Sequence, residues 1–128
     1  MNHVPVLLEE ALHALNPRDG GLYVDATFGA GGYSRAILGA AEARVIAIDR
    51  DPRARKAADV LRAAHPGRFI FVQACFGELE GVLEQSGAEQ VDGMVFDLGV
   101  FLVVIASILL ALSELGRLSR NEIDGKEH

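Results

Sequence analysis

Apolar and polar positions along the chain change their spacing in blocks, which predict helices and strands in turn. Helical spacing from Val6 to Leu15 predicts an amphipathic helix, which the turn residues 16–21 end. Short apolar runs predict strands at 22–25, 44–49, 69–73 and 91–98, and the run at 44–49 is rich in β-branched residues. Helical stretches are predicted between them at 32–38, 54–64 and 76–85. This alternation favours an α/β fold with a parallel sheet and right-handed crossovers.

Three of the predicted strands carry an acidic residue at their carboxyl end. These residues are Asp25, Asp49 and Asp97. The carboxyl ends of parallel strands lie along one edge of the sheet, and open α/β sheets bind ligands beyond that edge. We therefore expect the three carboxylates to converge at a ligand site, although each could also be an ordinary strand-end or helix-capping acid.

A glycine turn, Gly29-Ala30-Gly31-Gly32, follows the first of these strands. Glycines let the backbone approach a ligand closely, and an acid at the end of the next strand, here Asp49, is placed to take ribose hydroxyls. A glycine turn after a strand is also common without any ligand. Together with the spacing of Asp25 and Asp49, it favours a nucleotide-cofactor half-site.

The charge beside this turn favours one class of cofactor. Asp25 lies just before the glycines, where it would repel the pyrophosphate of a dinucleotide. The dinucleotide fingerprint would also place its third glycine or alanine at Ser34. S-adenosylmethionine has an ammonium, a sulfonium and no phosphate, so the acid would attract it. A small NAD-type oxidoreductase domain is the weaker alternative.

Composition limits the other partners. The chain has 128 residues, half of them apolar, which suits one globular domain, and its net charge of -6 argues against holding nucleic acid by phosphate neutralisation alone. The basic residues in and just before the predicted helix at 54–64 are better interpreted as a solvated face than as an RNA surface; they are Arg50, Arg53, Arg55, Lys56 and Arg62. The four histidines lack metal-ligand spacing, so no metal site is expected.

The single cysteine and the apolar run near the end of the chain also carry predictions. Cys75 cannot form an internal disulfide, which favours a reducing, cytoplasmic setting and a buried thiol. No secretory signal is expected at the start. Val100 to Leu112 is apolar except for Ser107, and it is shorter than the roughly 20 residues that span a bilayer. We expect an apolar C-terminal helix that is buried or self-associates, followed by a polar, frayed end at Ser113 to His128.

Four stretches of the sequence together resemble one known family. They are His3 to Glu10, Val24 to Arg35, Ile48 to Pro52 and Val91 to Val100. In this order and at this spacing they closely resemble the bacterial small-subunit ribosomal RNA cytosine-N4 methyltransferases (the RsmH or MraW family). The resemblance implies a class I methyltransferase fold, which is Rossmann-like, and S-adenosylmethionine as donor. It also implies that the acceptor is the exocyclic amine of a cytosine in the decoding region of the small ribosomal subunit.

The resemblance also implies roles for individual residues. Gly31, Gly32 and Tyr33 would line the methionine end of the cofactor, although the family usually has histidine where Tyr33 stands. Asp49 would hold the ribose and Phe76, which otherwise suggests a core residue, would lie against the adenine. Asp97 would face the donor and is our candidate catalytic residue. The expected cofactor-binding set is Asp25, Gly29, Gly31, Gly32, Tyr33, Asp49, Phe76 and Asp97.

The resemblance ends at Val100. The family continues there with a polar serine, serine, proline, glutamine stretch, whereas this chain has Phe101 to Ile105. The family's substrate-recognition insertion and remaining strands have no counterpart either. We therefore expect residues 1–100 to be the cofactor-binding half of a methyltransferase, and residues 101–128 to be a divergent tail produced by truncation, frameshift or fusion. An active methyltransferase and a non-catalytic fragment of one both remain open.

Overall fold

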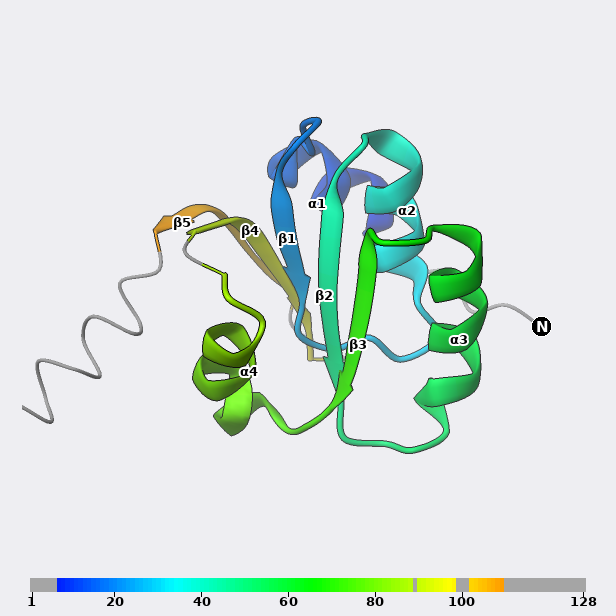
Figure 1. Cartoon of the computed structure of the whole chain (residues 1–128). Helices are drawn as coiled ribbons and strands as arrows, with labels where there is room; N and C mark the ends of the chain where they lie inside the picture. Colours follow the sequence, from blue (N-terminus) through cyan, green and yellow to red (C-terminus); the bar gives the residue numbers. More distant parts are fainter. Residues whose placement is uncertain (1–6, 89, 99–101, 110–128) are drawn as a thin grey trace, which may run out of the picture.

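The computed structural model describes residues 7–88, 90–98 and 102–109 (Figure 1). Its elements follow one another along the chain as α1 (Leu8–Leu15), β1 (Leu22–Asp25), α2 (Gly32–Ala40), β2 (Arg44–Asp49), α3 (Ala54–Ala64), β3 (Phe69–Gln73), the 3-10 turn η1 (Phe76–Glu78), α4 (Leu79–Gln85), β4 (Gln90–Asp97) and β5 (Leu102–Leu109). The predicted alternation of strand and helix is confirmed up to β4.

The strands form one sheet in the order β3-β2-β1-β4-β5. β1 lies between β2 and β4 and pairs with both in parallel, and β2 pairs in parallel with β3. The chain therefore runs outward from β1 to one edge and then returns to its other side at β4. The strand order reverses at β1, which is the place where open α/β sheets bind their ligands.

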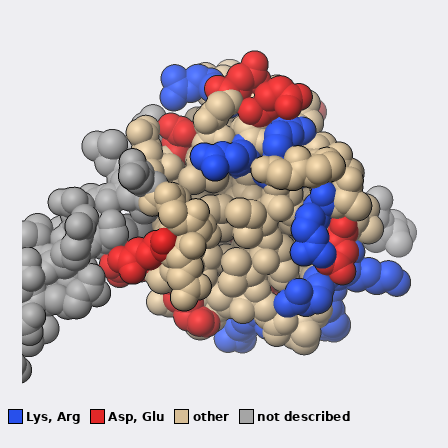
Figure 2. Space-filling model, viewed as in Figure 1, with Lys and Arg blue, Asp and Glu red and all other residues tan. Residues whose placement is uncertain are grey.

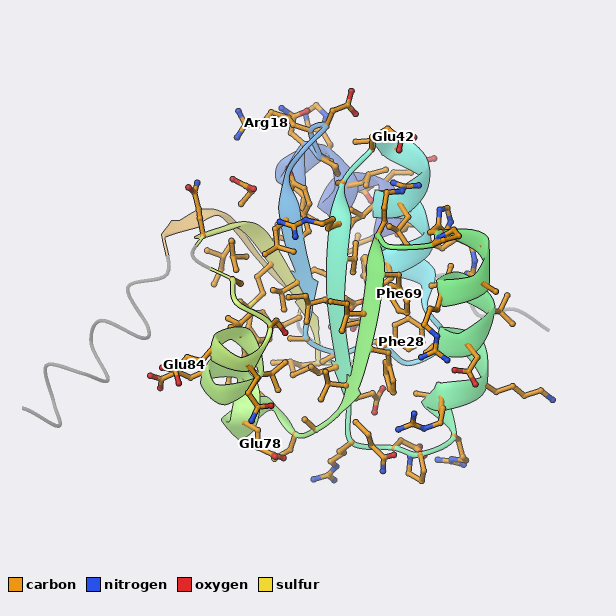
Figure 3. The ribbon with its side chains drawn as sticks, viewed as in Figure 1. Arg18, Phe28, Glu42, Phe69, Glu78 and Glu84 are labelled. Carbon is orange, nitrogen blue, oxygen red and sulfur yellow. The ribbon has the colours of Figure 1, made fainter. Side chains whose placement is uncertain are left out.

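Helices cover both faces of the sheet. Successive residues of a strand point to opposite faces, so Tyr23 joins a core cluster with α1, α2 and α3, whereas Val24 joins a second cluster with α4. Figure 1 shows α4 apart from the other three helices. Phe28 packs on Phe69 of β3 with ring centroids 5.7 Å apart, inside the first cluster (Figure 3). The α/β fold with flanking helices is therefore confirmed.

The prediction of an apolar helix near the end of the chain is wrong for Leu102–Leu109. These residues form β5, which pairs antiparallel with β4. The run is uncharged and has three consecutive β-branched residues at 103–105, which suits a half-buried strand beside the free edge of β4. Val104 packs against the first core cluster, and Ile105 stays 43% exposed. The predicted residues 100–101 and 110–112, and the frayed end at 113–128, lie outside the described residues.

Candidate functional site

The three strand-end acids meet at one edge of the sheet, as the sequence predicts. Asp25, Asp49 and Asp97 end β1, β2 and β4, which are neighbours in the sheet. The loop after β1 crosses this edge. Its amides donate to the carboxylates of Asp25 and Asp49, and its Thr27 side chain accepts the Asp97 amide. Predicted acids and predicted glycine turn therefore form a single site at the point where the strand order reverses.

The glycine turn is held tightly to the end of β2. The amide of Gly29 donates a 2.8 Å hydrogen bond to Oδ2 of Asp49. Gly29 and Gly31 both have positive φ, at 56° and 88°, which L side chains rarely adopt. A Cβ on Gly31 would also lie 2.8 Å from Cζ of Phe28. The turn therefore needs glycine for its backbone shape and, at Gly31, for close packing on the core.

Asp49 combines a fixed position with access to solvent. Its Oδ1 accepts the amide of Asp51 at 2.9 Å, while Oδ2 accepts Gly29. Each carboxylate oxygen can accept a second hydrogen bond. The side chain is half-buried and lines two cavities, one toward Phe76 and one toward α3. Asp49 is therefore a rigid acceptor that still has capacity for hydroxyl groups of a ligand.

Asp25 lies underneath the site, fully buried. Its Oδ2 accepts the hydroxyl of Ser34 at 2.8 Å, and its Oδ1 accepts the amide of Thr27 at 3.2 Å. Burial raises the pKa of Asp25 to about 6, against the lowering effect of these hydrogen bonds and with a smaller contribution from the charge of Asp49. Asp25 has no exposed surface through which it could contact a ligand in this structure.

Asp97 is held by its backbone and by its side chain. Its amide donates a 2.6 Å hydrogen bond to Oγ1 of Thr27, and its Oδ2 accepts the hydroxyl of Tyr33 at 3.4 Å. Burial, followed by the charge of Asp97, raises the pKa of the Tyr33 phenol to about 12. The phenol therefore stays protonated near neutral pH and remains a donor to Asp97.

Phe76 lies on the other side of Asp49, at the start of η1. Its ring is 58% exposed and meets the edge of Phe96, with centroids 4.9 Å apart. Phe76 and Asp49 line a cavity of about 420 Å³. The expectation of a buried thiol is wrong, because Cys75 is exposed beside Phe76. Its amide and thiol donate to Glu78 and cap this turn instead of packing in the core.

These residues fit a nucleoside with a charged amino-acid chain. The site presents a half-buried carboxylate, an exposed aromatic ring and a glycine-rich backbone. Asp49 lines both the 420 Å³ cavity and a second cavity of about 560 Å³ beside Gly29. A ribose needs hydrogen-bond acceptors and a base needs a flat apolar face. S-adenosylmethionine therefore suits the groups that the site presents.

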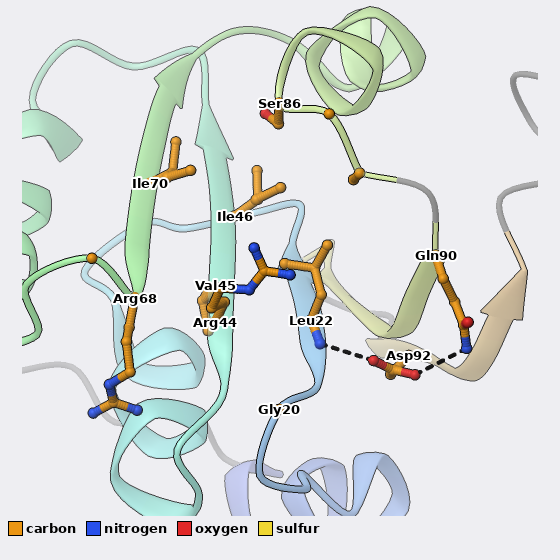
Figure 4. Close-up of a pocket in the computed structure, with 13 residues that line it drawn as sticks. Gly20, Leu22, Arg44, Val45, Ile46, Arg68, Ile70, Ser86, Gln90 and Asp92 are labelled. Carbon is orange, nitrogen blue, oxygen red and sulfur yellow. Dashed lines mark hydrogen bonds between the residues drawn. The ribbon is translucent and has the colours of Figure 1, made fainter.

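Another cavity, of about 520 Å³, opens at the opposite end of the strands, between β2 and the turn after α4 (Figure 4). Leu22, Ile46 and Ile70 form its apolar part, and Figure 2 shows that charged side chains lie mostly around the rim of this face. Asp92 lines it, but its carboxylate already accepts the Leu22 amide and the Gln90 side chain. This cavity brings together none of the predicted site residues.

Two residues of the site were not predicted as functional. Thr27 links β1 to β4. Ser34 stands where the dinucleotide fingerprint would have its third glycine, and its hydroxyl binds Asp25. A threonine two residues after a strand-end aspartate is a usable signal, because such an aspartate often accepts that backbone amide. Within the described residues, no group of three or more His, Cys, Asp or Glu side chains could hold a metal ion. No helix of the described part is both long and apolar enough to cross a membrane.

Comparison with known proteins agrees with this geometry. The sequence profile of the MraW methylase family matches residues 1–107. Proteins from Maricaulis maris and Rhodospirillum rubrum, both named ribosomal RNA small subunit methyltransferase H, are each 54% identical over 98 residues. The match covers 77% of this chain but only 29% and 30% of those two proteins. The chain thus spans less than a third of their length.

The fold also occurs among solved structures. The crystal structure of an rRNA methylase from Streptococcus thermophilus matches 78% of this chain and 58% of its own, with a TM-score of 0.56 and 22% sequence identity. The predicted resemblance, and with it the class of fold, is confirmed, which leaves the oxidoreductase alternative without support. By sequence, this chain belongs to the MraW methylase family.

Proposed function

We propose that this chain forms the donor-binding half of an S-adenosylmethionine-dependent methyltransferase that acts on ribosomal RNA of the small subunit. The observation that carries the proposal is the convergence of Asp49, Asp97 and the glycine turn at one strand edge, beside the exposed ring of Phe76. The names of the two relatives support the RNA substrate. A cytoplasmic location is part of the same proposal.

Each residue has a role in this proposal. Asp49 accepts the ribose hydroxyls, Phe76 packs against the adenine, and the backbone at Gly29, Gly31 and Gly32 lines the amino-acid end. Tyr33 holds the carboxylate of Asp97 by its hydroxyl. Asp25 acts on the same site through Thr27 and Ser34, since its own carboxyl is buried. We include Asp25 in the binding set as a support for the glycine turn.

The bound donor would supply an electrophilic methyl group on a sulfonium, and the protein's task is to position the acceptor beside it. Asp97 ends β4 at the site and keeps a carboxylate there that can orient the exocyclic amine of a cytosine. A base in folded RNA must be exposed or flipped out to reach such a group. Parts that would hold the RNA are not identified among the described residues.

Calorimetric titration of the purified chain with S-adenosylmethionine tests the donor site. We expect saturable binding, no binding of NAD, and at least about a tenfold loss of affinity in Asp49→Ala. Asp59→Ala is the matched control, because Asp59 lies on the exposed face of α3 and pairs there with Arg62. Equal binding by both variants, or binding of NAD alone, would contradict the proposal.

Methyl transfer separates an active enzyme from a non-catalytic fragment of the family. The assay follows labelled methyl groups from S-adenosylmethionine into immature small ribosomal subunits. Incorporation that is lost in Asp97→Asn would support activity with Asp97 at the reacting centre. Donor binding without incorporation would assign the chain to the non-catalytic alternative that the sequence leaves open.

A further inference from the structure

A chain of hydrogen bonds connects the buried carboxyl of Asp25 to Asp97, which lies on another strand. The Thr27 amide donates to Oδ1 of Asp25 at 3.2 Å, and the Thr27 hydroxyl accepts the Asp97 amide at 2.6 Å. Thr27 thus receives the end of β4 on its side chain while its own backbone is fixed to the end of β1. The separation of 70 residues between Thr27 and Asp97 makes this a long-range tertiary link.

Two residues of α2 bind the side chains of the same two aspartates. Ser34 donates to Asp25 at 2.8 Å, and its neighbour Tyr33 donates to Asp97 at 3.4 Å. The bonds therefore close a ring that runs from Asp25 through Thr27, Asp97 and the first turn of α2 back to Asp25. Along the chain, the glycine turn lies between Thr27 and Tyr33, which both belong to this ring.

The bonds of this ring differ in strength and in accessibility. The Tyr33 contact is long for a bond between two oxygen atoms, whereas the Thr27 contact is short. Ser34 and Asp25 are fully shielded from solvent, and Thr27 is half-buried. Water therefore competes little for the buried part of the ring, and Thr27 provides its shortest link to Asp97.

We propose that Thr27 is a positioning residue. Its hydroxyl holds the backbone at the end of β4 and so places Asp97 beside the loop that carries the glycine turn. This inference rests on the proposed function for its effect on donor binding, but the link itself does not. The strand pairing of β1 with β4 stops at Asp25 and Val95, and the next amide, that of Ala26, donates to the Val95 carbonyl at 2.9 Å. The Thr27 hydroxyl extends this connection from Val95 to Asp97, so removing it loosens the end of β4 from the loop that receives the donor.

The test compares Thr27→Val with Thr27→Ser. Valine has the shape of threonine without the hydroxyl, whereas serine keeps the hydroxyl and loses only the methyl group. Both variants keep the Thr27 backbone amide that binds Asp25. Ser86→Ala is the control, since the Ser86 hydroxyl also binds the backbone, donating to the Val82 carbonyl at 2.8 Å, but lies at the remote C-terminal end of α4.

The first readout is hydrogen exchange of the Asp97 amide, followed by NMR in the free protein. We expect Thr27→Val to speed this exchange about tenfold relative to the remaining β4 amides, and Thr27→Ser and Ser86→Ala to leave it within about twofold. Unchanged exchange in Thr27→Val would overturn the link. Because no donor is present, this readout is independent of the proposed function.

The second readout is the Kd for S-adenosylmethionine, measured by calorimetry on the same four proteins. We expect Thr27→Val to bind about tenfold more weakly and Thr27→Ser to restore the affinity of the original chain. Faster exchange with unchanged affinity would overturn the positioning role. Failure of the unaltered chain to bind would overturn the proposed donor site and with it this role, while the exchange data would still decide the link.

Discussion

The hydroxyl of Ser34 donates a 2.8 Å hydrogen bond to Oδ2 of Asp25, and both side chains are fully buried. This bond joins the first turn of α2 to the end of β1 directly beneath the glycine turn. The Asp25 carboxyl is thus held in the core by neutral groups, which include the Ser34 hydroxyl and the Thr27 amide. The arrangement has a consequence for stability that can be measured.

We expect stability to fall as pH rises toward neutrality because of Asp25. Its pKa is raised from 3.8 to about 6, so the folded state binds the proton more tightly than the unfolded chain. The stabilisation by this proton is complete below pH 3.8 and is lost as pH rises through about 6, for a total of about 3 kcal/mol. Urea unfolding in a pH series measures this slope.

Asp25→Asn should remove that slope. The amide oxygen can accept from Thr27, and the amide nitrogen can donate to Ser34 once its hydroxyl turns. We therefore expect the variant to be at least as stable as the original chain at about pH 7 and to lose the decline above about pH 4. Asp19→Asn is the control, because Asp19 is exposed and accepts the Glu42 amide at the surface. An unchanged slope in Asp25→Asn would show that another group titrates.

A pair of glycine substitutions tests the packing of the turn. Gly31→Ala puts a methyl group 2.8 Å from Phe28 in a backbone with φ of 88°, so it should cost about 1–3 kcal/mol of unfolding free energy. Gly39→Ala lies in α2 with nothing within 4 Å of its new methyl group. It should be neutral or stabilise by up to about 1 kcal/mol. Equal effects in urea unfolding would argue against the strained turn.

Phe76 offers a test of the base-binding side of the site. Stacking of a base on an aromatic ring is worth about 1–3 kcal/mol, so Phe76→Ala should weaken binding of S-adenosylmethionine about tenfold or more. The ring is 58% exposed, so stability should change little. Ile70→Ala is the control, since Ile70 on β3 is 49% exposed and lines the cavity at the other end of the strands. Calorimetry that finds the same affinity in both variants would exclude Phe76 from the site.

The sequence also predicts self-association through the apolar run, and β5 gives this a structural basis. β5 ends the sheet, and its eight residues are uncharged. Such an edge offers backbone groups to a second chain. Ile105→Lys should reduce concentration-dependent association in sedimentation velocity, whereas Val60→Lys, with the same added charge on α3, should not. If both variants still associate, or if both lose association, pairing at β5 is contradicted.

Local patterns were enough to predict the parallel part of the fold and the meeting of the acids. Each parallel strand is a short, mainly apolar run, and parallel pairing places Asp25, Asp49 and Asp97 at one edge whatever the details of packing. The glycine turn was predictable for the same reason, because positive φ at Gly29 and Gly31 is a local requirement.

Tertiary context decided what the sequence could not. A short apolar run is compatible with a buried helix or a strand, and the free edge of β4 selected the strand at Leu102–Leu109. The burial of Asp25 depends on Ser34, and the exposure of Cys75 depends on the turn that Glu78 caps. Thr27 was missed because its partner Asp97 lies far along the chain.

The measurement that tests the account most directly is NMR titration of the isotope-labelled chain with S-adenosylmethionine. The account predicts saturable shifts at the amides of Gly29, Gly31, Asp49 and Asp97, and none of these shifts with NAD. Shifts confined to the cavity at the other end of the strands, around Gly87, or no shifts in a folded chain, would contradict it.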